Sequence, residues 1–184
     1  PEPRPLYGLD RLAARPEAKV LVVEGEKCAD VGTEHLLDWV TVSWPGGCGA
    51  IGKIDWGPLA GREVVTWADC DAKREPLTTT EKRAGLTGAE IDALQASKPF
   101  LPEGKQPGTL AMTAIVAGLK PLGCKLWRVR IPAPGEKPDG WDVADAVADG
   151  LTGAALASWM QDRLERVGID QTAPGITPEA PPKR

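Results

Sequence analysis

Residues 19–25 read KVLVVEG, an apolar run that ends in an acid and a glycine. A continuous, β-branched run of this length is typical of a parallel strand that is buried on both faces. Similar runs follow at residues 40–44, 63–67 and 125–131, and helical spacing is found at residues 27–37 and 109–119. Strands that alternate with helices predict an α/β fold, here a Rossmann-like, mostly parallel sheet of about four strands flanked by helices.

Residues 73–107 interrupt this alternation with a polar segment. Two capping-box patterns, Thr78 with Glu81 and Thr87 with Glu90, each predict the start of a short helix. The composition favours a helical insertion on the sheet over a second domain. We therefore expect one domain over residues 1–168, which contains this insertion.

The end of the chain contains one more predicted helix and a tail. Residues 152–167 place Leu156, Trp159, Met160, Leu164 and Val167 at helical spacing, and Gly168 would end the helix. Residues 169–184 contain four prolines and few apolar side chains, which predicts a flexible linker.

Composition excludes several classes of protein. The 184 residues carry 22 basic and 26 acidic side chains, a net charge of −4 that does not suit binding of duplex DNA through bulk electrostatics. The four cysteines form no C-x-x-C pair, so they are expected to be reduced thiols of a cytoplasmic protein. A single histidine, His35, makes a His-based triad or multi-His metal site untenable. No apolar run approaches the length of a membrane-spanning helix, so no membrane partner is expected.

Carboxylates follow two of the predicted strands. Glu24 ends the first apolar run, while Asp69 and Asp71 follow the third. In an open α/β sheet, ligands bind at the carboxyl ends of the strands, so these acids would meet at one edge if the two strands are neighbours. Two aspartates spaced two apart in an extended chain point to the same side. Oxygen ligands without His or Cys suit Mg²⁺ or Mn²⁺ better than zinc.

An apolar strand ending Glu-Gly, followed later by one ending Asp-x-Asp, resembles the Toprim domain of topoisomerases and primases. The segments VLVVEGEKCAD, TVSWPGG, DWGPLAGREVVTWADCD and PDGWDVADAV are similar to the versions in phage and plasmid primase-helicases. The resemblance covers about residues 5–167.

The resemblance implies a role for each matching residue. Glu24 would be the general acid or base, Asp69 and Asp71 would bind the metal, and Gly25 would allow the tight turn beside them. Asp142 resembles a further acidic metal position in the primase-type domains, with Asp145 as its neighbour. Asp142 would equally serve as the cap of a short helix.

Two positions depart from the pattern of replicative primases. Those proteins carry an aspartate four residues after the glutamate, where this chain has Cys28, with Asp30 nearby. The Asp-x-Asp is usually followed closely by a glycine, whereas here Ala72-Lys73-Arg74 follows.

A competing motif is present in residues 47–52, which spell G-x-G-x-x-G after a strand, with Asp69 about 20 residues further on. A dinucleotide site needs a long helix that starts at these glycines. Gly57-Pro58 leaves room for two turns at most, so we expect instead a loop near the acidic site, with Lys53 available to a phosphate.

These observations predict a primase-type nucleotidyltransferase, part of a larger phage or plasmid enzyme, that makes primers with Mg²⁺ or Mn²⁺. Its expected partners are a single-stranded DNA template, nucleotides and a helicase domain or subunit, which could belong to the same polypeptide. Lys53, Lys73 and Arg74 are the candidate phosphate contacts of this acidic domain. A Toprim-type nuclease, a non-catalytic docking module beside a helicase and a dinucleotide-binding enzyme are the alternatives.

Overall fold

The computed structural model describes residues 2–167, and within them a five-stranded sheet has the order β2-β1-β3-β4-β5. The first four strands are parallel neighbours, and the fifth pairs antiparallel with β4. The strands are β1 (Lys19–Val22), β2 (Trp39–Val42), β3 (Glu63–Thr66), β4 (Lys125–Val129) and β5 (Leu164–Arg166). The predicted α/β class and mostly parallel sheet are thus confirmed, with one strand more than expected.

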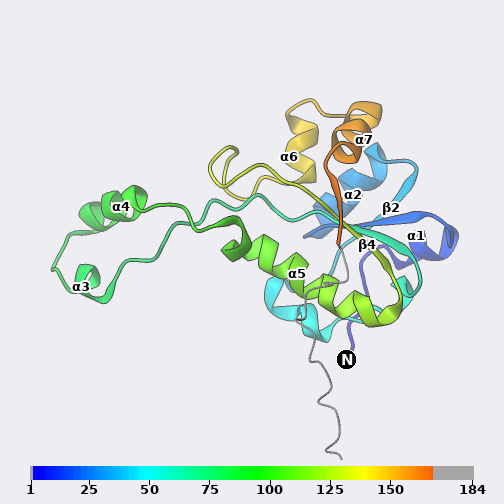
Figure 1. Cartoon of the computed structure of the whole chain (residues 1–184), viewed down its shortest axis with the longest axis horizontal. Coiled ribbons are helices and arrows are strands. Elements are labelled where there is room, and N and C mark those ends of the chain that lie inside the picture. Colours follow the sequence, from blue (N-terminus) through cyan, green and yellow to red (C-terminus); the bar gives the residue numbers. More distant parts are fainter. Residues whose placement is uncertain (1, 168–184) are drawn as a thin grey trace, which may run out of the picture.

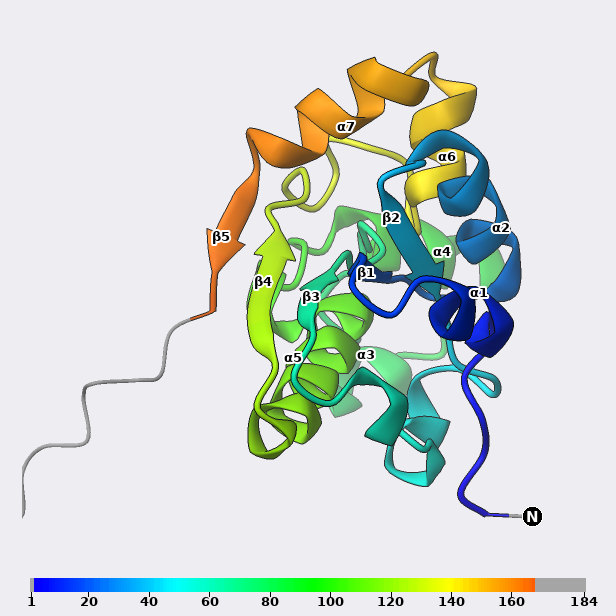
Figure 2. The same cartoon turned by 90° about the vertical axis from the view of Figure 1, so that its right-hand side faces the viewer.

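Helices cover both faces of the sheet (Figures 1 and 2). The α-helices of the body are α1 (Leu9–Ala14), α2 (Glu26–His35), α5 (Pro107–Leu119), α6 (Val143–Ala148) and α7 (Gly153–Gln161). Short 3₁₀ turns are η1 (Cys48–Lys53), η2 (Gly57–Leu59), η3 (Glu103–Lys105) and η4 (Lys120–Leu122).

The alternation of side chains along β1 divides the core into two layers. Val20 and Val22 pack with α5, whereas Leu21 and Val23 pack with α2, α6 and α7. Because successive strand residues point to opposite faces, a strand that is apolar at every position fits only a sheet with helices on both sides. This explains why residues 19–23 carry no polar side chain beyond Lys19.

The C-terminal part of the described chain differs from the sequence prediction. The expected helix over residues 152–167 ends at Gln161, and Leu164–Arg166 form β5 instead. Three register pairs join β5 to β4, including Val129 with Leu164. Pairing with a distant strand overrides the local helical spacing, because the half-buried Leu164 packs against the core from its place beside β4. The predicted linker, residues 169–184, lies outside the described residues.

The polar insertion forms an arm that we define as residues 73–105. It contains α3 (Thr79–Lys82) and α4 (Gly88–Ser97), and neither helix has a buried residue. Both predicted capping boxes are formed at the starts of these helices. Figure 1 shows that the arm projects away from the body, so it does not lie on the sheet as expected. Its polar composition offers too little apolar surface to hold it there.

No helix among residues 2–167 is long and apolar enough to cross a membrane.

Candidate active site

The ends of β1 and β3 form the edge where the predicted acids lie. These strands are parallel neighbours, with Val22 opposite Thr66, and the Trp67 N–H donates to the Val22 carbonyl at 3.0 Å. The acids were predicted to meet at one edge if these two strands were neighbours, and the strands are neighbours. Beyond β1 the chain passes Glu24 and turns at Gly25, whose φ of 83° is one that L side chains rarely adopt. Gly25 therefore serves as the predicted turn and precedes the first residue of α2.

Asp69 is the most perturbed carboxylate at this edge. Burial, and next the negative charge of Glu24, Asp142, Asp71 and Asp145, raise the pKa of Asp69 to about 8. Both effects disfavour the ionised carboxylate, because the charge loses hydration and meets like charges. The structure thus places the other four predicted acids close enough to act on Asp69 through their charges.

Asp71 is arranged differently from the sequence prediction. The Asp71 N–H donates to the Asp69 carbonyl at 3.0 Å, so the chain turns at Cys70 and is not extended there. The Oδ2 atom of Asp71 accepts a 2.6 Å hydrogen bond from the Gly108 N–H in the first turn of α5. The extended conformation expected between the two aspartates is therefore wrong. Asp71 is held by a helix N-terminus, where negative charge is favourable.

Asp142 caps α6 through a capping box with Asp145. Its Oδ1 atom accepts from the Asp145 N–H at 2.9 Å, and the Asp145 carboxylate accepts from the Asp142 N–H at 3.3 Å. The other oxygen, Oδ2, accepts from the Cys28 thiol at 2.8 Å. Burial, and then this bond to Asp142, raise the pKa of the Cys28 thiol. Cys28 of α2 thus contacts Asp142 at the start of α6.

Glu24 faces the glycine loop that follows β2. The exposed Cys48 thiol lies 3.4 Å from its Oε1 atom, and burial together with this contact raises the pKa of Cys48 to about 11. The loop is a short 3₁₀ turn, Cys48–Lys53, so the long helix required by a dinucleotide site is absent at these residues. The expectation of a loop beside the acidic edge is confirmed.

The carboxylate oxygens at this edge are the type of ligand that a hard divalent cation prefers. They are not arranged as a coordination site. The repulsion that raises the pKa of Asp69 would be relieved by a cation between the carboxylates. Among residues 2–167, however, no three His, Cys, Asp or Glu side chains stand close enough together to hold an ion. An oxygen of Asp71 and both oxygens of Asp142 also accept hydrogen bonds within the protein.

No protein-family model, no curated protein and no solved structure matches this chain.

The three predicted phosphate contacts all have partners inside the protein. Lys53 pairs with Glu2 at 3.0 Å, and Lys73 forms an ion pair with Asp139. The Arg74 guanidinium lies 3.9 Å from the centroid of the Phe100 ring. The structure therefore does not gather them into one free basic patch, and a phosphate would have to compete with Glu2 and Asp139.

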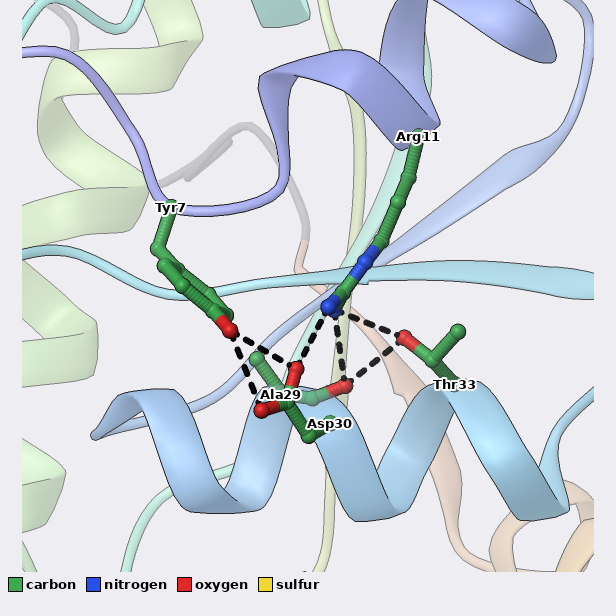
Figure 3. A network of polar contacts seen from close by, with 5 residues as sticks. All are labelled: Tyr7, Arg11, Ala29, Asp30 and Thr33. Carbon is green, nitrogen blue, oxygen red and sulfur yellow. Dashed lines mark hydrogen bonds and ion pairs between the residues drawn. The ribbon is translucent and has the colours of Figure 1, made fainter.

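Asp30 belongs to a separate network on the side of α2 that faces the N-terminal segment and α1 (Figure 3). It accepts hydrogen bonds from the Tyr7 hydroxyl at 2.9 Å and from Arg11, which also donates to Thr33. Arg11 first, and then Tyr7, lower the pKa of Asp30. Asp30 thus ties the N-terminal segment to α2.

A hollow of about 260 Å³ lies between α5 and β4, with Met112, Val116 and Val129 among its lining residues. It includes Ala68, but none of the five acids lines it. The acidic edge is therefore a surface at the ends of the strands and is distinct from this apolar hollow.

Proposed function

We propose that this chain carries out Mg²⁺-dependent nucleotidyl transfer on nucleic acid, as the Toprim domain of a primase of phage or plasmid type. The observation that carries the proposal is the shared carboxyl edge of β1 and β3, where burial and the charge of Glu24 raise the pKa of the half-buried Asp69 to about 8. A fold that keeps like charges together at a ligand-binding edge tolerates a cost that a cation would remove.

Each acid has a distinct part in the proposed reaction. Asp69 and Asp71, with Asp142 as a further candidate, would hold Mg²⁺, which supplies charge neutralisation at the transferred phosphoryl group. Glu24 would exchange a proton with the attacking or leaving hydroxyl. Its neighbour Glu26 is exposed at the start of α2, whereas Glu24 is half-buried and its charge acts on Asp69. The substrates would be nucleotides on a single-stranded DNA template, with a helicase domain or subunit as partner.

The test compares primer synthesis by the wild type, Glu24→Gln and Glu26→Gln on single-stranded DNA with nucleotides and Mg²⁺. Loss of a general acid or base costs about 10²–10⁴ in rate. We expect this loss in Glu24→Gln and a near-normal rate in Glu26→Gln. The proposal is wrong if Glu24→Gln primes normally. A template that is shortened in the same reaction, with no primer made, identifies a nuclease instead.

A non-catalytic docking module is the second candidate, because one observation favours it. The carboxylates of Asp71 and Asp142 accept hydrogen bonds at the N-termini of α5 and α6. Bonds of this kind stabilise helices without any metal. A docking module would show no divalent-ion dependence in stability, and all the variants above would behave alike in every assay of catalysis.

A further inference from the structure

One buried side chain closes the root of the arm. Gln106 is 1% exposed, although the residues of the arm beside it are exposed or half-buried. Its Oε1 atom accepts from the Lys73 N–H at 3.0 Å. Its Nε2 atom donates to the carbonyls of Lys73 at 3.1 Å and Leu101 at 2.8 Å. Gln106 therefore fastens the segment that leaves the sheet to the segment that returns to it.

The same residue stands at the start of α5. Gln106 occupies the N-cap position, and the Gly108 N–H two residues later donates to Asp71. Asp71 lies only two residues before Lys73, and Gln106 lies two residues before Gly108. The bond from Lys73 to Gln106 and the bond from Gly108 to Asp71 therefore close a small ring that contains the Asp71 carboxylate. A Cβ atom at position 108 would lie 2.9 Å from the Asp69 carbonyl oxygen, so the chain segments are also in close contact.

We propose that Gln106 is a positioning residue that sets the Asp71 carboxylate by holding the arm root against the first turn of α5. Its importance for catalysis rests on the proposed function, in which Asp71 holds Mg²⁺. The positioning itself does not, because it follows from the ring of hydrogen bonds. Neither helix of the arm has a buried residue, whereas Gln106 is a buried polar side chain that links the root of the arm to the first turn of α5.

Asp139 provides the competing explanation. It accepts from the Ala72 N–H at 2.8 Å and pairs with Lys73, so it holds the same turn from the other side. If Asp139 alone fixed the turn, loss of the Gln106 hydrogen bonds would leave Asp71 and Gly108 unmoved. The two explanations therefore predict different behaviour of the Gly108 amide.

The test uses Gln106→Met, which keeps the side-chain volume and removes the three hydrogen bonds. Gln95→Met is the matched control, because Gln95 donates to the Glu75 carbonyl at 2.9 Å within the arm, away from Asp71. The primary readout is the NMR resonance of the Gly108 amide. We expect it to shift upfield in Gln106→Met, as in Asp71→Asn, and to stay unchanged in Gln95→Met. An unchanged Gly108 resonance in Gln106→Met overturns the proposal.

Activity provides the second readout. The Mg²⁺ concentration for half-maximal rate should rise about 10-fold or more in Gln106→Met, as is typical when a partner of a metal ligand is lost. A shifted Gly108 resonance without any divalent-ion dependence of a reaction would uphold the positioning role and refute the proposed function. Should Gln106→Met not fold, Gln106→Glu keeps an acceptor for Lys73 and loses the donated bonds, and the same resonance decides.

Discussion

Asp69 is the residue at which the fold is most strained electrostatically. Its pKa is raised to about 8 by burial and by the neighbouring carboxylates. The unfolded chain releases this proton near pH 4, whereas the folded chain holds it up to about pH 8, so the folded state binds more protons between these values. Its contribution to stability is therefore present below pH 4 and is lost as the pH rises to 8.

Asp69→Asn should remove the loss of stability that the wild type shows between pH 4 and pH 8. In a metal-free buffer with chelator, we expect the melting temperature of Asp69→Asn to exceed that of the wild type by several degrees at pH 8 and to approach it near pH 4. Asp92→Asn, which changes an exposed carboxyl on the arm, is the control. Thermal unfolding followed by circular dichroism checks the prediction. A difference in melting temperature between wild type and Asp69→Asn that is the same at pH 4 and pH 8 would refute it.

The same residues show what sequence can reveal about the site. The strand-end rule was enough to bring Glu24 and Asp69 to one edge, because parallel strands end together. The turn at Cys70 and the bond from Gly108 to Asp71 were not foreseeable, since they depend on where α5 begins after the long polar insertion. Likewise the contacts of Cys28 with Asp142 and Cys48 with Glu24 join segments that no local pattern connects.

The arm is the element whose removal should cost least. Its two segments meet where the Glu75 N–H donates to the Pro99 carbonyl at 2.9 Å, so a short Asn-Gly turn can replace residues 76–98. Of these residues only Leu77 is buried, and it is 9% exposed. We expect the free energy of unfolding to change by less than about 1 kcal/mol in denaturant titrations.

Ile115→Ala provides the contrast, because Ile115 is fully buried on α5 and its truncation should cost about 2–5 kcal/mol. An arm deletion that destabilises the chain as much as Ile115→Ala would show that the arm is part of the core. At the scale of elements, the sequence predicts α2, α5 and the parallel strands correctly, because the hydrophobic pattern of each lies within its own residues. It fails for β5, because that strand owes its conformation to β4.

The molecule as a whole carries a net charge of −4 and must meet a polyanion if it acts on nucleic acid. A divalent cation bound at the acidic edge would both reduce this charge and stabilise the fold. At a Mg²⁺ concentration about 10 times the Kd, the stabilisation is about 1.4 kcal/mol, which corresponds to a rise of about 3–6 °C in Tm. We expect this rise in wild type at pH 8, measured by thermal unfolding, and a loss of it in the Asp69→Asn/Asp71→Asn double variant.

The central claim is that the carboxyl edge of β1 and β3 binds a divalent cation through Asp69. Calorimetric titration of Mn²⁺ into the wild type and into Asp69→Asn at pH 8 tests it most directly, with Asp92→Asn as the control for non-specific binding. We predict one saturable site in the wild type and in Asp92→Asn, and no site in Asp69→Asn. Equal heats in the wild type and Asp69→Asn would contradict the claim and favour the docking module.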